Sequence, residues 1–279
     1  MARTEYVSSN FRITHTIEEE GPHPTIAYDY YDETYSITIV LEGEGVCFVE
    51  GKGHTLSPGT IVVVSPEEVR LFRLKQSGCH RRISLYFSGQ LLSSLWDYEL
   101  SLLQIFSGHA PGEENRYGPE QYNPQQVGSL LEQLCALLEQ EESETKAPRA
   151  QLLILQLLVC LYESRRQVPV RMGSFVPNEI TAKICNYIKD HLTEELTYQQ
   201  LQSRFYVSRY QLSHVFQRDT GMTLNEYILY KRLIKAVSLI RGGQGLEAAA
   251  YKAGFCTYSH FYKVFRKRFG VSPKTYFFN

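Results

Sequence analysis

The chain has few cysteines and no long apolar run. Its six cysteines lie far apart with no C-x-x-C pair, which argues against a zinc ribbon or a dense disulfide framework and is typical of a reducing compartment. No apolar signal segment stands at the N-terminus, and the longest apolar stretch, residues 152–162, is well short of the roughly 18 residues that span a bilayer. We therefore expect a cytoplasmic protein, neither secreted nor inserted in a membrane.

The composition is that of a folded protein with two domains. Apolar residues make up 43% and charged residues 21% of the 279 residues, which excludes disordered and fibrous classes, and the length exceeds one compact core. Residues 167–177 hold two prolines and a glycine between two helical patterns, a composition typical of a linker. The expected domains are residues 1–166 and 178–279.

The two domains carry opposite charge. Residues 178–279 contain 15 basic and 7 acidic side chains, a balance of +8, whereas residues 1–177 contain 14 basic and 23 acidic ones, a balance of −9. A basic domain joined to an acidic one points to a polyanion, here double-stranded DNA, as the partner of the basic part.

The acidic domain begins with a β pattern. Residues 34–87 read as short β-branched and aromatic runs separated by glycine turns, which predicts an antiparallel barrel or sandwich. Helical patterns follow over 91–106, 125–140 and 148–166, with a loop over 107–124, so the domain is α+β. Tyrosines suit an amphipathic pocket for a small-molecule effector, although they can equally be ordinary strand residues. The candidate effector-binding residues are Tyr28, Tyr30, Tyr35 and Tyr86.

The helix predicted over 148–166 is apolar on nearly every side. Such a helix needs cover all round. The barrel and the neighbouring helix can each cover one side, and a second copy of the chain can cover the rest, which predicts a homodimer through residues 125–166. Burial within a single chain is the alternative.

The basic domain contains an internal repeat. Residues 208–223 match residues 257–272 at an offset of 49 positions, as between Leu212 and Phe261, and each copy has the period of an amphipathic helix. In the first copy Leu212 and Phe216 share the apolar side, and in the second Phe261 and Phe265 do so. The opposite sides hold hydrogen-bonding side chains at equivalent positions: Tyr210, Ser213, His214 and Gln217 in the first copy, and Ser259, Tyr262, Lys263 and Arg266 in the second.

Capping signals place these helices in two helix-turn-helix units. Thr197-x-x-Gln200, Ser208-x-x-Gln211 and Thr223-x-x-Glu226 are capping boxes, which start helices near Tyr198 and Arg209 and open a long connecting helix to Ile240. The units span about 197–218 and 245–268. The connecting helix, about 25 Å long, lets the two reading helices reach successive major-groove segments, about 34 Å apart on the duplex.

The last hundred residues resemble the DNA-binding domain of AraC/XylS-type regulators. The resemblance is carried by Gly254-Phe255, Ser259-His260-Phe261, Val264-Phe265-Arg266, Phe269-Gly270, Ser272-Pro273 and Tyr276. The N-terminal part resembles the cupin barrel, at Gly53, Pro58 and Gly59. Together they imply an all-α C-terminal domain of seven helices, and an effector-responsive transcriptional regulator whose barrel takes a sugar or related metabolite.

The resemblance also implies residue roles and partners. Base edges would be reached by Tyr210, Ser213 and His214 from the first helix and by Ser259, Tyr262 and Lys263 from the second. Phosphates would be contacted by Arg209, Gln217, Arg218, Arg266 and Lys267. An N-terminal arm, residues 4–24, would respond to the effector, and the protein would contact RNA polymerase.

The metal ligands of the cupin motifs are missing. No histidine stands in residues 30–36 or 67–70, where the motifs place them, and imidazoles are what hold iron, manganese or zinc in such sites. His15, His23, His54 and His80 follow no metal spacing and are expected to be structural or surface residues. We therefore predict no metal, no cofactor and no catalytic residue.

Three functions remain to be compared. The first is a dimeric regulator with an effector in its barrel, and the second is a regulator whose acidic domain only dimerises. The third is an enzyme, either a metal cupin or a DNA-repair methyltransferase joined to this helical domain. The missing histidines oppose the former enzyme, and the absence of clustered zinc cysteines opposes the latter.

Overall fold

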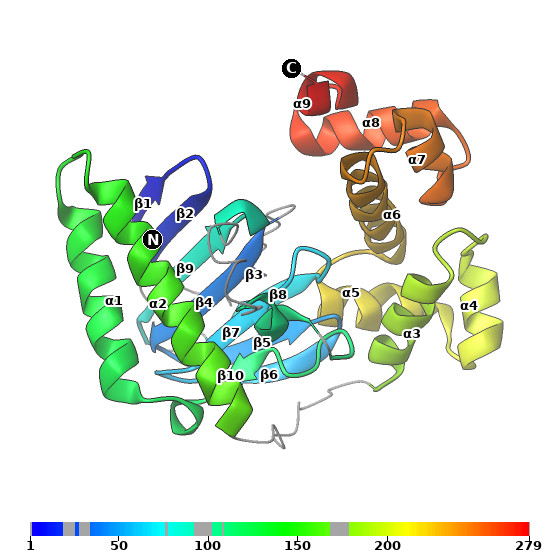
Figure 1. Ribbon diagram of the computed structural model, residues 1–279. Coiled ribbons are helices and arrows are strands. Elements are labelled where there is room, and N and C mark those ends of the chain that lie inside the picture. The colour runs from blue at the N-terminus through cyan, green and yellow to red at the C-terminus, as the bar shows by residue number, and fades with distance from the viewer. Residues whose placement is uncertain are drawn as a thin grey trace. The chain divides into compact units, whose positions relative to one another are not determined.

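The computed structural model describes residues 2–18, 26–27, 34–75, 78–91, 102–107, 109–167 and 179–278. The chain divides into two compact units, Met1–Phe175 and Val176–Asn279 (Figure 1). Apart from Gln167, the linker expected over 167–177 lies outside the described residues, so its bounds stay a prediction.

Two antiparallel sheets form the body of the N-terminal unit. In the described residues, one has the strand order β1-β2-β9-β4-β7-β10 and the other the order β3-β8-β5-β6. The strands are β1 (Ala2–Val7), β2 (Phe11–Glu18), β3 (Ile26–Ala27), β4 (Tyr35–Glu42), β5 (Gly45–Val49), β6 (Lys52–Leu56), β7 (Ile61–Val64), β8 (Arg70–Leu74), β9 (His80–Phe87) and β10 (Arg116–Tyr117). The predicted sheet-rich domain is confirmed.

The period-two alternation of the strands separates two kinds of surface on the larger sheet. Ile37 and Ile39 of β4 point to a large apolar core shared with the helices that follow the barrel. The alternate residue Val40 belongs instead to a smaller cluster with Cys47 and Phe72 of the other sheet. The second face of the larger sheet therefore looks toward the smaller sheet.

Residues 4–18, expected to belong to an N-terminal arm that responds to the effector, form two paired strands of the larger sheet. The strand β1 pairs with β2, and β2 pairs with β9 along its whole length, from Phe11 opposite Phe87 to Glu18 opposite His80. Strand pairing satisfies the backbone donors and acceptors of this segment, so residues 4–18 belong to the sheet. Residues 19–24 lie outside the described residues.

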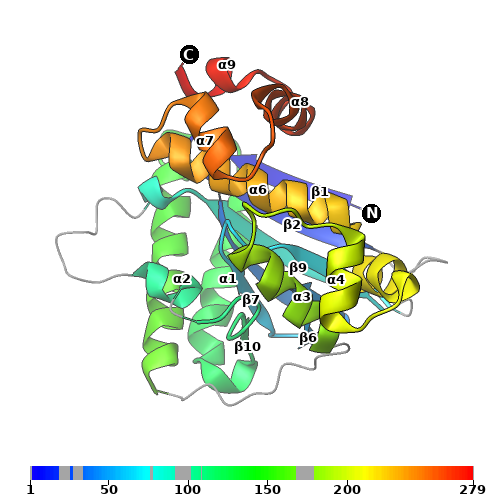
Figure 2. The same cartoon turned by 90° about the vertical axis from the view of Figure 1, so that its right-hand side faces the viewer.

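Two helices cover the outer face of the larger sheet. They are α1 (Pro124–Glu139) and α2 (Lys146–Gln167), which run side by side in both views (Figures 1 and 2). Asn123 caps α1, its side chain accepting from the amides of Gln125 and Gln126. Both predicted helices are confirmed within two residues. Of the helix predicted over 91–106, residues 92–101 are not described, and its end is a short 3₁₀ helix, η2 (Leu102–Phe106).

Most of the apolar surface of α2 is covered within the chain. Ile154, Leu157, Leu158 and Leu161 are fully buried in the core beneath the sheet. Leu152, by contrast, is 61% exposed. The loop predicted over 107–124 also contains β10 and a 3₁₀ turn, η3 (Pro119–Gln121).

The C-terminal unit is entirely helical over its described residues. Its elements are α3 (Glu179–Asp190), α4 (Tyr198–Phe205), η4 (Gln211–Val215), α5 (Phe216–Thr220), α6 (Leu224–Arg241), α7 (Leu246–Lys252), α8 (Tyr258–Phe269) and α9 (Pro273–Phe278). The turns of η4 have π-type spacing and continue into α5 with helical dihedral angles on both sides, so the domain has seven helical segments. The predicted all-α domain is confirmed.

The capping boxes start their helices where the sequence places them. Thr197 and Thr223 accept from the amides of Gln200 and Glu226, whose side chains accept from the cap amides in return. Ser208 and Gln211 make the same reciprocal pair. These local bonds satisfy amides that a helix start leaves without partners, which explains why the boundaries could be predicted.

Candidate nucleic-acid interface and buried polar site

The first reading helix, residues 209–220, buries one side and exposes the other. Leu212 and Phe216 have no more than 1% of their surface exposed, and the Phe216 ring meets Tyr227 of α6 edge-on at a centroid distance of 5.4 Å. The predicted apolar stripe is therefore the contact with the rest of the domain.

The polar side of this helix carries an exposed aromatic pair. Tyr210 is 67% exposed, and its ring lies 4.6 Å from that of His214, which is also exposed. Arg209, Gln217 and Arg218 are exposed, whereas Ser213 is half-buried.

Arg218 is tied to the interior of the domain. Its Nε donates to Oδ1 of Asp219 at 2.9 Å, and the fully buried Asp219 accepts from the hydroxyl of Thr181 on α3. These bonds link the reading helix to α3.

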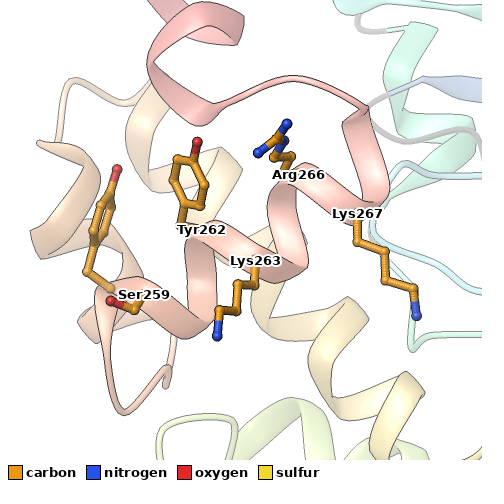
Figure 3. A pocket seen from close by; sticks show the side chains of 6 residues that line it. Ser259, Tyr262, Lys263, Arg266 and Lys267 are labelled. Atoms are coloured by element: carbon orange, nitrogen blue, oxygen red, sulfur yellow. The ribbon is translucent and has the colours of Figure 1, made fainter.

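The second reading helix, α8, repeats the arrangement. Phe261 and Phe265 are fully buried, while Ser259, Lys263, Arg266 and Lys267 are exposed and Tyr262 is half-buried. The polar residues and Tyr258 line a shallow hollow of about 700 Å³. In Figure 3, Tyr262 and Arg266 extend from one flank of the helix, and Lys263 and Lys267 from another.

Residues 49 positions apart occupy equivalent places on the two helices. His214 corresponds to Lys263 and Gln217 to Arg266, and all four are exposed. Side chains with donors and acceptors suit base edges, and cations suit phosphates. The arrangement fits a surface that meets a duplex twice, and the assignment of each side chain to a base or a phosphate stays a prediction.

A buried polar site lies between the two sheets of the N-terminal unit, and among its residues the sequence pattern had indicated only Tyr86. Polar side chains alternate with apolar ones on strands of both sheets, and each faces the opposite sheet. They are Thr14, Thr16 and Glu18 of β2, Ser36 and Thr38 of β4, Arg82, Ser84 and Tyr86 of β9, and Arg70 of β8, each no more than 6% exposed. The same alternation is visible in the sequence, but only the strand pairing shows that these residues share one space.

Two arginines dominate this site. Arg82 donates from Nη2 to Oε1 of Glu18 at 2.7 Å, an ion pair in which both side chains are more than nine-tenths buried. Arg70 donates from Nη1 to the hydroxyl of Ser36 on the facing sheet, and its guanidinium lies 5.4 Å from the centre of the Tyr86 ring.

The four predicted effector tyrosines separate in the structure. Tyr28 and Tyr30 lie outside the described residues. Tyr86 is 2% exposed in the polar site, with Arg12 also over its ring at 4.6 Å. Tyr35 lies on the opposite face of the sheet, packed on Phe87 and Phe106, and burial raises the pKa of its phenol. Because successive strand residues face opposite sides, half-buried Tyr35 packs against the helix-side core and does not line the space around Tyr86, which corrects its selection as an effector-binding residue.

The histidines show no metal geometry in the part of the chain that is described. The His54 ring donates to the carbonyl of Gly112 at 3.0 Å, and burial lowers its pKa to about 4. His80 bonds the carbonyl of Lys75 at 2.7 Å, while His23 is not described. Across the described residues no three histidine, cysteine or acidic side chains gather as metal ligands.

The six cysteines are free thiols. No described helix has the length and apolarity to cross a membrane.

Comparison with known proteins identifies both units. A family model described as an AraC-like ligand binding domain matches residues 16–158, just over half of the chain, and one described as a helix-turn-helix domain matches residues 201–278.

Curated relatives span nearly the whole chain. The HTH-type transcriptional activator RhaS of Enterobacter sp. (strain 638) is 28% identical over 247 residues, which cover 88% of this chain and 86% of that protein. RhaS of Escherichia coli O6:H1 (strain CFT073) is 26% identical over 250 residues, with the same two shares.

Solved structures resemble the chain more loosely. ToxT from Vibrio cholerae O395, bound to a naphthalenyl butenoic acid, covers 97% of this chain and 99% of its own at 16% identity, with a TM-score of 0.42. The DNA-binding domain of AdpA in complex with a target DNA covers 34% of this chain and 86% of its own at 25% identity, with a TM-score of 0.33.

Proposed function

Because the chain belongs to the AraC-like transcriptional regulators, with a ligand-binding domain followed by a helix-turn-helix domain, we propose that it activates transcription from a promoter it reads with two helices. A small effector bound between the sheets of the N-terminal unit modulates that activity. We place the protein in the cytoplasm, in contact with RNA polymerase, and assign it no catalytic role.

One observation carries the proposal for DNA. Two helices with matching sequence each bury an apolar stripe and expose a polar one. Nothing in the stability of the domain requires hydrogen-bonding groups at the same places on both, whereas reading two groove segments does. We assign His214 and Lys263 to base edges, with Arg209 and Lys267 nearer the phosphates.

Replacing His214 or Lys263 by alanine is expected to relax sequence preference locally. Each variant should lose about 1–3 kcal/mol of discrimination between the preferred base pair and the others at one position, because one set of contacts to a base edge is removed. Fragments retained by the wild-type protein from a random duplex library give the preferred sequence, and the variants are then titrated against every single-base change in it.

The exposed Lys235 of the connecting helix α6 serves as the control, since Lys235→Ala removes the same charge as Lys263→Ala from a helix other than the two reading helices. An equal loss of affinity on all sequences for the His214 and Lys263 variants would show phosphate contact and contradict base readout.

We propose that the effector is a sugar or a related metabolite that contacts Tyr86. Support comes from the buried hydroxyls and arginines around that ring, because a deep polar site is costly to maintain without a ligand. Titration of the DNA affinity of the full chain with metabolites tests this. An N-terminal unit that only dimerises predicts no change with any of them.

We propose that two copies of the chain form a dimer through the exposed side of α1 and α2. Leu152, Leu137 and Leu153 border a groove of about 300 Å³, together with glutamines and Arg149. An exposed leucine in a groove lined by both apolar and polar side chains suits a two-fold contact, in which each copy inserts the same residue.

Leu152→Glu is expected to shift the protein from dimer to monomer, because the contact would bury an unpaired charge. Sedimentation equilibrium of the full chain measures this, with Gln126→Glu as the control, since Gln126 is exposed on α1 but outside the groove. A dimer that persists with undiminished affinity in Leu152→Glu places the contact elsewhere.

A further inference from the structure

We infer that the effector of this protein is a hydroxylated carboxylic acid, such as a sugar acid, and that Arg70 receives its carboxylate. The inference rests on the proposed function, since it names the chemistry of the ligand in the N-terminal unit. Arg70 is not among the residues that the sequence pattern singled out.

Arg70 is a buried cation with unused donors. Only 5% of its surface is exposed, and its Nη1 donates to Ser36. Its Nε and Nη2 are fully shielded from solvent and have no hydrogen-bond partner among the described residues. Burying an ion without a counter-charge costs several kcal/mol. A ligand that brings a negative charge to Arg70 would offset this cost.

Arg82, on β9 of the larger sheet, is the other buried arginine of the polar site. Arg82 has its own carboxylate, Glu18, at 2.7 Å. No described carboxylate lies within ion-pair distance of Arg70. The buried Glu68, two residues earlier, is held instead by the amides of Ser65 and Gly112 and by the side chain of Asn115. Among the described residues, Arg82 therefore has a carboxylate partner and Arg70 has none, which leaves Arg70 available to a ligand.

The position of the unused nitrogens specifies the ligand group. Nε and Nη2 form one edge of the planar guanidinium, with two N–H bonds pointing the same way. That edge matches the two oxygens of a carboxylate in a bidentate contact. Ser36 occupies Nη1 at the opposite corner and so leaves this edge open.

The surroundings of Arg70 specify the rest of the molecule. The hydroxyls of Thr38 and Ser84 lie 3.1 Å apart on the same face, with Thr14 bonded to the carbonyl of Ser84. A hydroxyl that donates one bond still accepts others, so this wall can hold several ligand hydroxyls. A polyhydroxylated acid fits better than a fatty acid or an aromatic acid.

The test compares matched acids and neutral sugars on the full chain. Galacturonate is paired with galactose, glucuronate with glucose, and gluconate with sorbitol, and glucose 6-phosphate serves as a different oxyanion. We expect at least one carboxylic acid to raise the melting temperature and bind by calorimetry, while its neutral partner does neither. In Arg70→Met the affinity for that acid should fall by about 30-fold or more, as expected for loss of a bidentate charged contact.

Arg73→Met is the matched control. Arg73 lies on the same strand but on the opposite face, over the Phe48 ring, so its loss should leave the affinity unchanged. The ligand-free melting temperature supplies a second readout. Arg70→Met should melt at or above the wild-type temperature, because it removes an uncompensated buried charge, whereas a purely structural arginine would lower it.

The inference is overturned if no acid of the panel binds, if only the phosphate ester binds, or if acid and neutral sugar bind equally to wild type and Arg70→Met. If a neutral sugar alters DNA affinity, the proposed function is supported and the carboxylate at Arg70 is contradicted. If an acid binds through Arg70 without changing DNA affinity, the carboxylate is supported and the effector-responsive function is contradicted.

Discussion

Phe265→Ala is expected to destabilise the C-terminal unit by about 3–5 kcal/mol, a large part of the roughly 5–15 kcal/mol that stabilises a typical domain. The Phe265 side chain has no exposed surface and stands at the centre of an aromatic cluster. Its ring centroid lies 4.3 Å from that of Phe269, 5.6 Å from Phe261 and 5.4 Å from Tyr276. Alanine leaves a cavity. The neighbouring rings on α8 and α9 could fill it only by moving and losing their present packing contacts.

Urea unfolding of the full chain, followed by helical circular dichroism, measures the loss. Lys263→Ala on the same helix is the control and should change stability by no more than about 0.5 kcal/mol, because Lys263 is exposed. If the C-terminal unit of Phe265→Ala unfolds at the same urea concentration as that of the wild type, the aromatic cluster does not stabilise the packing of α8. DNA affinity should fall with the folded fraction, in contrast to the base-specific loss expected for Lys263.

Gly254→Ala is expected to have a comparable effect, above about 3 kcal/mol, through the backbone. Gly254 ends α7 with a φ of +98°, and a Cβ there would stand 2.1 Å from the carbonyl oxygen of Leu192. That carbonyl already accepts from Nε of Arg232 at 2.8 Å. The methyl group would strain the dihedral angle and push apart a contact that joins the end of α3, the connecting helix and the turn before α8.

Gly243 offers a control that separates strain from collision. Its φ is +88°, but a Cβ there would meet no atom within 4 Å. Gly243→Ala should therefore cost only the conformational strain, about 1–2 kcal/mol. Equal destabilisation of the two variants, measured by the same unfolding curves, would show that the contact with Leu192 contributes nothing.

The placement of Gly254 explains why the turn of the second helix-turn-helix unit was readable in the sequence. Its amide donates to the carbonyl of Tyr251, and the amide of Phe255 reaches back to Ala250. These bonds close α7 and bury the Phe255 ring against Phe261. A glycine followed by an aromatic residue is thus a local signal for the end of a helix. The close approach of Leu192, 62 positions earlier, cannot be predicted from local sequence.

The helices of the basic domain followed from the sequence because their causes are local. Caps at Thr197 and Thr223 and the spacing of Leu212 and Phe216 involve residues within one or two turns, and such interactions depend little on the remaining fold. The same reasoning predicted α1 and α2. The pairing of β2 with β9 could not be predicted in this way, because the two strands lie far apart in the chain, with Phe11 opposite Phe87 and Glu18 opposite His80.

The sequence by itself therefore determined the two-domain order, the reading helices with their buried and exposed sides, and the lack of a metal motif. Only the tertiary structure decided which polar residues of the N-terminal unit face a common interior. Arg70 meets Ser36 across two sheets, and Tyr35 turns away from Tyr86. Side-chain direction in a strand is set by register, register is set by partners far away in the chain, and a shift of one residue would reverse every face.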